Sequence, residues 1–411
     1  KSAQLQSRAL PTKARRITPT GMMESNPSLA ALIDSASAAV AELSGQTARW
    51  RAAAPGRINL IGEHTDYNQG WVLPVAIDRY TAMAAAPGVP GQIRVRSLAI
   101  AQESSLSLDQ LHTPHRDPWM RYVQGVIAQY DSRGVHCPGL DVAVASSVPP
   151  GGGLSSSAAL ELATAHLLEA VTEQALTGSE RIEACVQAER EMASVPCGIM
   201  DQTVVELAES GQALLLDCAD QTARSVPFDS QAPAVLVIHS GVSHALAEGA
   251  YAQRRADCEQ ARAQLGVNSL REVSPDQLAR LKDEGVLQQR ATHVVSENQR
   301  VCDAVTAIEQ RQWDRLGALM TASHRSLRDD YEVSCPELDL LVELATAERG
   351  VYGARMTGGG FGGCVIVLVA SDRLEAVVDS VSGQYNQHMG WAPGCYRIQA
   401  GAGAREICTA L

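Results

Sequence analysis

The feature that most constrains this chain is a run of glycines and serines, Ser147-Val-Pro-Pro-Gly-Gly-Gly-Leu-Ser-Ser-Ser-Ala-Ala-Leu160. A β-rich stretch (140–146) precedes it, and an Ala- and Leu-rich stretch with a helical pattern (156–173) follows it. Three consecutive glycines permit close backbone approach, and a serine can cap the helix. Free N–H groups and the positive end of the helix dipole favour an anion there. The segment therefore predicts a phosphate-binding loop; the alternative is a capped loop without a ligand.

Lysine is nearly absent from the chain, with Lys1, Lys13 and Lys282 as its only examples. The glycine-rich segment contains none, whereas a Walker P-loop, the ATP site of a protein kinase and a Schiff-base enzyme each depend on a lysine. Lys282 lies in the charged stretch 280–284, which matches none of these motifs. We therefore set these three mechanisms aside.

Composition narrows the class of protein further. The 411 residues are 45% hydrophobic and 19% charged, which is typical of a soluble globular protein, and a net charge of −12 disfavours nucleic acid or an anionic membrane as a partner. No stretch reaches the roughly 18 to 20 apolar residues that cross a bilayer. The ten cysteines form no C-x-x-C pair, which disfavours a structural zinc site and indicates reduced thiols. We therefore expect a cytoplasmic protein.

The first residues differ from the rest, because they are basic and contain no acidic residue before Glu24. They lack the apolar core of a secretory signal. We interpret residues 1–25 as a disordered basic extension, and both a transit peptide and an artefact ahead of a start at Met22 or Met23 stay open.

The remainder alternates β-rich and helical stretches, which predicts an α+β chain. The Pro-containing stretch 223–233 suggests a division into domains at 26–225 and 226–411. The expected strands are 92–98, 140–146, 213–217, 234–239 and 364–369, and the expected helices are 27–44, 117–131, 156–173, 179–193, 245–265, 295–310, 312–326 and 336–348.

One carboxylate falls on the apolar side of the expected helix 179–193. Ile182, Cys185 and Val186 form an apolar stripe, and Glu189 continues it. A buried charge needs a cationic partner. An arginine would serve, but near a phosphate loop Mg²⁺ is the better candidate, because it takes one or two protein ligands plus phosphate oxygens and water.

A cluster of polar residues lies within the segment 54–68. Arg57, Glu63, His64 and Asp66 alternate there with aliphatic residues that indicate partial burial. Buried polar groups require partners, and a polyhydroxylated ligand supplies many. The pattern is not H-E-x-x-H, so it favours sugar recognition over metal binding.

Two further glycine-bearing segments are weak signals when taken alone. Segment 196–202 places Asp201 on the turn that leaves the Glu189 helix, and segment 355–364 precedes the expected strand 364–369. The G-x-G-x-x-G spacing in 358–363 comes before a strand instead of after one, which is the wrong context for a dinucleotide site.

Taken together, these segments resemble the galactokinase branch of the GHMP small-molecule kinases. Gly56-Arg-Ile-Asn-Leu-Ile-Gly-Glu-His-Thr-Asp-Tyr-Asn68 is similar to the galactokinase signature, and Pro150-Gly-Gly-Gly-Leu-Ser-Ser-Ser-Ala158 is similar to the ATP loop of the wider family. Met356-Thr-Gly-Gly-Gly-Phe-Gly-Gly363 resembles its third motif. The likeness extends from about residue 48 to the C-terminus.

The resemblance implies a function and a fold. The expected reaction is phosphorylation of D-galactose at its C1 hydroxyl, with ATP as co-substrate and Mg²⁺ as cofactor. The expected fold is a ribosomal-protein-S5-like N-terminal domain and a ferredoxin-like C-terminal domain, with the active site in the cleft between them. Alternatives are a kinase for N-acetylgalactosamine or galacturonate, or a sugar sensor without catalysis. We expect a monomer or weak dimer.

The resemblance also implies residue roles. Asp201 would take the C1 proton or only orient the hydroxyl, with Arg57 keeping it ionised. Ser157 and Glu189 would hold Mg²⁺. The sugar would be lined by Glu63, His64, Asp66, Gly198 and Tyr251. ATP would contact Gly151, Gly152, Gly153, Leu154, Ser155, Ser156 and Ser157, with Trp119 and Tyr122 near the adenine and with Gly358, Gly359 and Gly360 supporting the loop.

Overall fold

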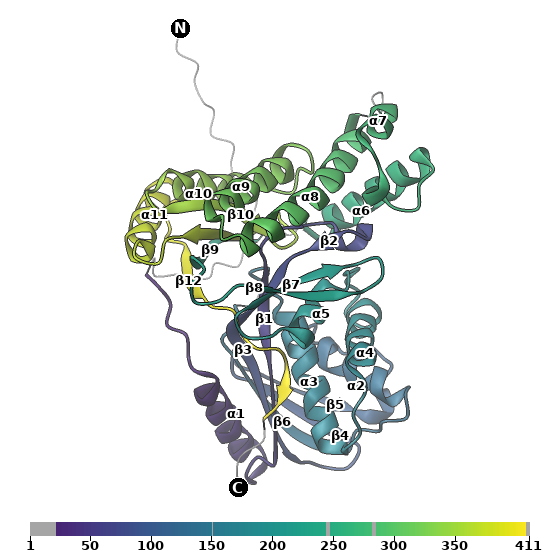
Figure 1. Cartoon of the computed structure of the whole chain (residues 1–411). Coiled ribbons are helices and arrows are strands. Elements are labelled where there is room, and N and C mark those ends of the chain that lie inside the picture. Colours follow the sequence, from purple (N-terminus) through teal and green to yellow (C-terminus); the bar gives the residue numbers. More distant parts are fainter. Residues whose placement is uncertain (1–21, 150, 244–246, 282–284, 408–411) are drawn as a thin grey trace.

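The structure is a computed structural model that describes residues 22–149, 151–243, 247–281 and 285–407. Its lower half in Figure 1 contains a six-stranded sheet in the order β13-β1-β3-β6-β4-β5, in which only β4 and β6 run parallel. The strands are β1 (Trp50–Asn59), β3 (Pro74–Pro87), β4 (Gln92–Ser97), β5 (Gln102–Ser107), β6 (Leu140–Ser146) and β13 (Arg405–Glu406).

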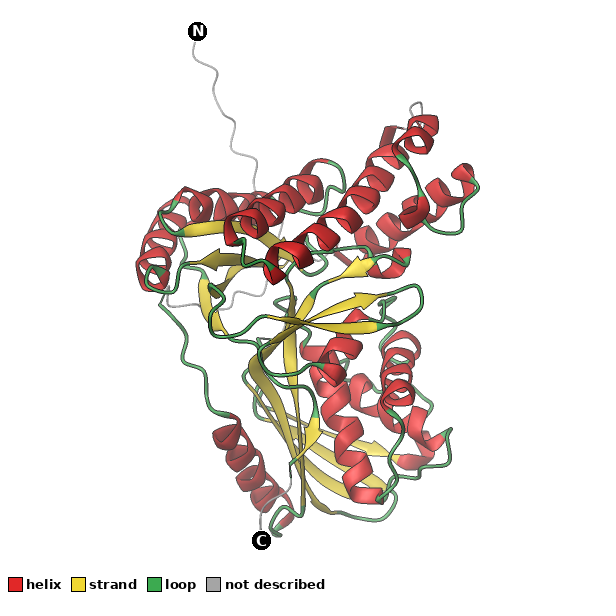
Figure 2. Ribbon diagram, viewed as in Figure 1, coloured by secondary structure: helices red, strands yellow, loops and turns green. Residues whose placement is uncertain are grey.

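Helices cover both faces of this sheet (Figure 2). The alanines Ala82, Ala84 and Ala86 of β3 pack against α1 (Leu29–Ser44) on one face, because small side chains let a helix approach closely. The residues between them, such as Met83 and Ala85, face a larger core on the other side. That side carries α2 (Met120–Asp131), α3 (Ser156–Thr172), α4 (Gly178–Glu191) and α5 (Met200–Leu207).

The second half contains a four-stranded antiparallel sheet in the order β10-β11-β9-β12. The element order β9, helices, β10, β11, helix, β12 is that of a ferredoxin-like unit. The strands are β9 (Ala234–Ser243), β10 (Val351–Thr357), β11 (Gly362–Val369) and β12 (Gly394–Ile398), and the helices are α6 (Ala247–Leu265), α7 (Pro275–Leu278), α8 (Gly285–Glu309), α9 (Trp313–Asp329), α10 (Pro336–Ala347) and α11 (Leu374–Met389).

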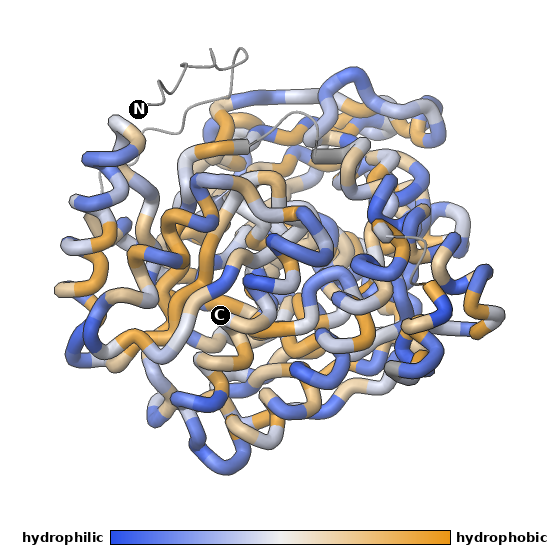
Figure 3. Tube along the Cα trace, turned by 90° about the horizontal axis from the view of Figure 1, so that it is seen from above, coloured by the Kyte–Doolittle hydropathy of each residue, from blue (hydrophilic) through white to orange (hydrophobic). Residues whose placement is uncertain are grey.

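A third sheet and a shared core join the two halves. Strands β2 (Trp71–Val72), β7 (Gln212–Asp217) and β8 (Ala223–Pro227) form this sheet, and the core beside it contains Ile58 of β1, Ile366 of β11 and Val301 of α8. In Figure 3 the hydrophobic stretches, coloured orange, lie mainly inside the molecule, and the hydrophilic stretches, coloured blue, lie mainly around its outside. Short 3-10 helices complete the fold: η1 (Asp66–Asn68), η2 (Leu108–Gln110), η3 (Leu270–Glu272) and η4 (Ala279–Leu281).

The α+β fold class is confirmed, but the sequence reading missed several elements. Strands β1, β3 and β10 and helix α11 were not expected, and α8 begins ten residues before the expected start at 295. Strand β3 was missed because both of its faces are buried, which removes the alternation of apolar and polar residues. The stretch 223–233 was interpreted as a break between domains. Its first five residues form strand β8, which pairs with β7, so the chain is still part of a sheet where the stretch begins.

Each end of the described chain packs against the half that contains the other end: the N-terminal residues contact the second half, and the C-terminal strand joins the first. Met23 forms a β-bridge with Cys395 of β12, and the N–H of Glu24 donates to the Cys395 carbonyl at 2.9 Å. Residues 22–25 therefore belong to the folded chain, which corrects the expected extension 1–25; residues 1–21 lie outside the described residues. At the other end, β13 pairs with β1 in the first sheet. The described helices include none with the length and apolarity needed to cross a membrane.

Candidate active site

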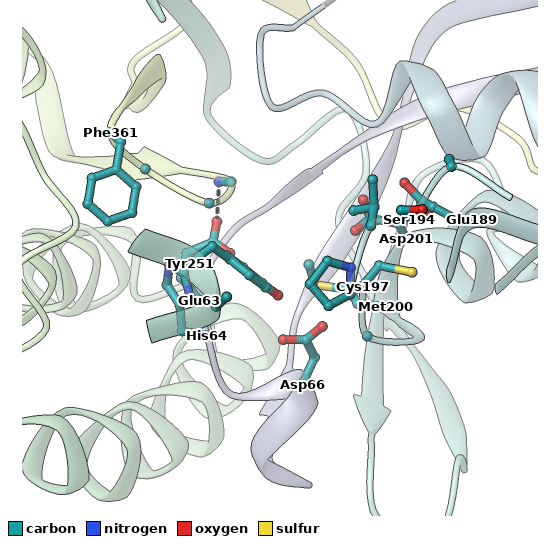
Figure 4. A pocket seen from close by; sticks show the side chains of 18 of the residues that line it. Glu63, His64, Asp66, Glu189, Ser194, Cys197, Met200, Asp201, Tyr251 and Phe361 are labelled. Carbon is teal, nitrogen blue, oxygen red and sulfur yellow. Dashed lines mark hydrogen bonds between the residues drawn. The ribbon is translucent and has the colours of Figure 1, made fainter. Parts of the chain in front are cut away.

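A cleft of about 880 Å³ lies where the two halves meet. In Figure 4, Glu63, His64 and Tyr251 lie to one side of it, Glu189, Ser194 and Asp201 to the other, and Asp66 between them. The side chains and backbone that line it come from both halves: Arg57, Glu63, His64, Asp66, Pro118, Arg121, Tyr122, Glu189, Ala193, Ser194, Val195, Pro196, Cys197, Gly198, Met200, Asp201, Tyr251, Ala252, Gly358, Gly359, Gly360 and Phe361.

Arg57 and Asp201 form a bidentate ion pair in this cleft. Arg57 Nε donates to Asp201 Oδ1 at 2.7 Å, and Nη2 donates to Oδ2 at 2.6 Å. Arg57 Nη1 donates to the carbonyl of Gly153 at 2.6 Å, so one guanidinium holds both the carboxylate and the glycine-rich loop. Burial alone would lower the pKa of Arg57, but the nearby carboxylates, led by Asp201, raise it above its ordinary value. The side chain of Asp201 stays 25% exposed to the cleft.

The backbone around Asp201 differs from the sequence reading. Asp201 does not lie on a turn; it is the second residue of α5. Ser155, which directly precedes α3, has a left-handed backbone (φ 54°) and donates its hydroxyl to Asp201 Oδ2. This carboxylate therefore accepts hydrogen bonds from two motifs that lie far apart in the sequence.

The glycine-rich loop packs directly on the third motif. A Cβ added to Gly358 would lie 3.2 Å from Gly153 Cα, so the two backbones touch where neither has a side chain. Both glycines have positive φ (86° and 71°), which other residues rarely adopt. Leu154 is buried, and its carbonyl accepts from the N–H of Arg57 at 3.0 Å. The third motif thus supports the loop by backbone contact.

Glu189 in the cleft lining and Ser157 beside it carry the kinds of oxygen atom that a magnesium ion binds. The Glu189 carboxylate contacts the Ser157 hydroxyl and accepts from Gln202 Nε2 at 2.6 Å. Burial, together with the negative charge of Asp201, raises the pKa of Glu189, so a cation beside it would be favourable. A hydroxyl and a carboxylate match the small number of protein ligands that Mg²⁺ takes beside phosphate. No group of three or more His, Cys, Asp or Glu ligands occurs among the residues described.

Glu63 connects the first motif to the third. Its Oε1 accepts from the N–H of Gly358 at 2.7 Å and from the Thr357 hydroxyl at 2.9 Å, while Oε2 accepts from Asn59 at 3.1 Å. The fully buried Arg355 lies 3.6 Å from the same carboxylate. Glu63 therefore holds the end of strand β10 and the following Gly358 against the segment 57–66, in addition to lining the cleft.

The Asp66 carboxylate can occupy its position only because Gly198 has no side chain. A Cβ on Gly198 would lie 2.6 Å from Asp66 Cγ and would overlap Oδ2. Burial, followed by the charge of Asp201, raises the pKa of Asp66 to about 6. Asp66 is therefore ionised at neutral pH and presents a carboxylate to the cleft.

His64 is the most buried ring at the cleft. Its Nδ1 lies 2.9 Å from the Tyr67 hydroxyl, its Nε2 has almost no accessible surface, and the ring forms a hydrogen bond with the backbone of Gly359. Burial, together with His293, lowers the pKa of His64 to about 3. The ring of Tyr251 lies 5.5 Å away. A neutral imidazole, held by Tyr67 and by the backbone of Gly359, thus forms part of the wall of the cleft.

Comparison with known proteins agrees with this geometry. A family model for the galactokinase galactose-binding signature matches residues 41–87, and models for the N-terminal and C-terminal GHMP kinase domains match residues 121–209 and 304–387. The galactokinase of Homo sapiens is 42% identical over 393 residues, which cover 93% of this chain and 98% of that protein. The chain belongs to the galactokinase family.

Other relatives support the assignment of family and fold. The galactokinase of Roseiflexus sp. is 42% identical over 361 residues, which cover 86% of this chain and 92% of that protein. The crystal structure of Lactococcus lactis galactokinase complexed with galactose superposes with a TM-score of 0.85 at 33% identity, covering 90% of this chain and 98% of that one. Methanococcus jannaschii mevalonate kinase shares the fold at 18% identity, with a TM-score of 0.63 and 85% and 98% of the two chains covered.

The structure brings most of the predicted site residues of this family member together. The predicted catalytic and sugar residues all line the cleft, as do Tyr122, Glu189 and the glycines of the third motif. The loop 151–157 reaches it through contacts of Gly153, Ser155 and Ser157. Trp119 does not line the cleft; it packs on the first core, and its buried indole N–H has no hydrogen-bond partner among the described residues. Its role at the adenine stays a prediction.

Several cleft residues were not anticipated from the sequence. Arg121 lies on the first turn of α2, and the segment 193–197 forms the wall beside Glu189. Glu161 is fully buried behind the site, where Gln202 Nε2 donates to its Oε2 at 2.9 Å. Glu161 could have been found from the sequence, because it is a charged residue among the alanines and leucines of the expected helix 156–173. Residues 193–197 have no sequence motif that would distinguish a cleft wall from an ordinary surface loop.

Proposed function

We propose that this chain catalyses the ATP-dependent phosphorylation of D-galactose at its C1 hydroxyl, giving galactose 1-phosphate and ADP. The observation that carries the proposal is the Arg57–Asp201 pair, which lies between the galactose-binding signature and the glycine-rich loop. Relatives named galactokinase match nearly the full chain, which favours this reaction over a kinase for another sugar or a sensor.

Sugar binding is assigned to the residues of the first motif and their neighbours. The carboxylate of Asp66 would accept hydrogen bonds from sugar hydroxyls, and the imidazole of His64 would line the sugar pocket beside it. Tyr251 would pack against the ring, and Gly198 leaves the space that Asp66 occupies. Glu63 would complete the pocket while holding the third motif.

Asp201 is proposed to orient the C1 hydroxyl and to receive its proton late. Because its carboxylate already accepts hydrogen bonds from Arg57 and Ser155, it is fixed in one orientation, which favours holding the hydroxyl over early proton removal. The C1 oxygen then attacks the γ-phosphorus, the bond from phosphorus to the β,γ-bridging oxygen breaks, and ADP leaves with the bonding electrons. The C1 proton passes to Asp201 and then to solvent. Such transfers depend mainly on positioning and charge.

The loop 151–157 and the N-terminus of α3 would hold the β- and γ-phosphates of ATP. Ser157 and Glu189 are proposed to hold Mg²⁺, which when bound offsets negative charge on the phosphates. Arg57 donates hydrogen bonds to both Asp201 and the glycine-rich loop, so it would hold the C1 hydroxyl of the sugar and the phosphates of ATP close together.

The test is ADP release with Mg-ATP and a panel of galactose, N-acetylgalactosamine, galacturonate and glucose. We expect the highest kcat/KM with galactose. A preference for a sugar modified at C2 or C6 would change the substrate and keep the mechanism. Sugar binding without ADP release would refute the kinase assignment and favour a sensor.

We also propose that the protein works in the cytoplasm as a monomer or weak dimer. The nine cysteines among the described residues are free thiols, which suits a reducing compartment. Sedimentation at micromolar concentration would test the oligomeric state.

A further inference from the structure

Arg121 carries a guanidinium that the fold leaves mostly unused. It lies in the first turn of α2, lines the cleft and is partly exposed. Its Nε donates to the carbonyl of His115 at 2.8 Å, which anchors the side chain to the loop before the helix. A guanidinium has five N–H groups, and those on Nη1 and Nη2 of Arg121 have no hydrogen-bond or ion-pair partner among the described residues.

The packing of α2 on α4 fixes where in the cleft Arg121 lies. The two helices run antiparallel, because Arg133, which follows α2, lies 4.0 Å from Glu183 near the start of α4. A Cβ added to Gly125, in the middle of α2, would lie 3.0 Å from Cβ of Met192, which follows the last residue of α4. Arg121 is one helical turn nearer the start of α2 than Gly125, so it lies beside the chain that leaves α4.

That end of α4 lies on the phosphate side of the cleft. Figure 4 shows Glu189 and Ser194 there, across the cleft from Glu63 and Tyr251 of the sugar side. Glu189 is the carboxylate assigned above to Mg²⁺ beside the phosphates. Arg121 therefore lies on the side that the proposed function assigns to the phosphate chain of ATP.

The charges of the cleft make a further cation necessary for an anionic ligand. The described residues that line it include two arginines, Arg57 and Arg121, and no lysine. Its carboxylates are more numerous: Glu63, Asp66, Glu189 and Asp201. All three nitrogens of Arg57 already donate, to Asp201 and to the carbonyl of Gly153. Arg121 is thus the lining arginine with donors left for a bound anion.

The start of α2 also favours an anion beside Arg121. The helix has no side-chain hydrogen bond at its N-cap, Trp119, and no acidic residue in its first turn. In contrast, Ser28 caps α1 and Thr177 caps α4. A cation in the first turn of a helix lies at the positive end of the helix dipole, which is unfavourable in the free protein. A bound anion would offset both positive charges at once.

From these observations we propose that Arg121 binds the phosphate chain of the nucleotide through its Nη1 and Nη2 groups, and that it supplies the cation that the lysine-free loop 151–157 lacks. The inference rests on the proposed function for the identity of the ligand, but nucleotide binding can be measured without sugar or turnover. The alternative role for Arg121 is purely structural, as the donor that holds the loop before α2 through the His115 carbonyl.

The deciding experiment is calorimetry on the full chain with adenosine, AMP and ADP, without sugar or metal. Arg121→Gln should raise the Kd for ADP about tenfold, the worth of a hydrogen bond to a charged group, and leave the Kd for adenosine unchanged. The difference between wild type and variant should shrink at high salt, because ions screen a partly exposed charge. The affinity for galactose should stay constant.

Arg133→Gln is the matched control. Arg133 is also a partly exposed arginine, but its Nη1 donates to the Gln129 carbonyl at 2.9 Å and it lies outside the cleft lining. Its replacement should leave the Kd of every nucleotide unchanged.

The outcomes separate phosphate binding from a structural role. Equal losses for adenosine and ADP, or an unchanged Kd for ADP in a folded Arg121→Gln, would overturn the proposal. Should the variant not fold, the wild type still provides a test: an affinity for ADP that falls no more steeply with salt than that for adenosine would contradict it. Arg121-dependent binding of ADP by a wild type that releases no ADP from ATP and galactose would instead refute only the proposed function.

Discussion

Replacing Gly198 by alanine tests the link between backbone packing and sugar binding. Gly198 does not have a positive φ, so alanine can adopt its backbone conformation without strain. The new Cβ would lie 2.6 Å from Asp66 Cγ and would overlap Oδ2. The Asp66 carboxylate must therefore rotate away, although the rest of the site keeps its structure.

The size of the effect follows from the hydrogen bond that is lost. A hydrogen bond to a charged group contributes about 1.5–3 kcal/mol, which corresponds to an increase of about 10- to 100-fold in the KM for galactose. The free energy of unfolding should change little, because alanine also restricts the unfolded chain and offsets part of the clash. We expect kcat to fall less than the affinity for galactose.

The assay is a double-mutant cycle with Asp66→Ala, measured as galactose KM in ADP release and as galactose affinity by calorimetry. If the clash acts only through the carboxylate, Gly198→Ala should add almost nothing in the Asp66→Ala background. Gly383→Ala in α11 is the control, because nothing lies within 4 Å of its added Cβ, and it should stabilise the protein by about 0.5–1 kcal/mol with unchanged KM. Additive effects of the two cleft mutations, or an unchanged KM in Gly198→Ala, would refute the reasoning.

Three further predictions follow from the site. Galactose affinity should fall as the pH drops through about 6, because Asp66 becomes protonated there while His64 stays neutral; Asp66→Asn should remove this pH dependence, and its persistence would point to another group. Asp201→Asn should lower kcat by about 10²- to 10⁴-fold and retain galactose binding by calorimetry, and full activity would exclude a role in the reaction. Glu189→Ala should raise the Mg²⁺ concentration needed for half-maximal activity; an unchanged Mg²⁺ dependence with a lower Tm would indicate that Glu189 is structural.

Most members of the site could be predicted from short sequence motifs. The glycine-rich loop, the Arg57–Asp66 cluster and the segment with Asp201 each place reactive groups within a few residues of one another, so local spacing is informative. The partners of these groups could not be predicted in the same way. Arg57 and Asp201 are 144 positions apart, and Tyr67 and Tyr331 are 264 apart.

The elements missed in the fold share a physical reason. Strand β3 is covered by α1 on one face and by the large core on the other, so it lacks an alternating pattern that would mark it as a strand. Helix α11 contains Ser380, Ser382 and Gly383, which lower its intrinsic helix propensity, and it is stabilised by packing on the second core.

Residue identity and local spacing are thus sufficient to predict the class of chemistry in this chain: they predict a phosphate loop without lysine, a sugar-binding cluster, and the carboxylates of Asp201 and Glu189 near them. The tertiary structure adds what depends on distance and direction. It pairs Arg57 with Asp201, keeps Gly198 open for Asp66, and places Tyr331 and Tyr67 behind His64. These contacts join residues far apart in the sequence and form only when the tertiary structure brings their elements together, so no local pattern encodes them.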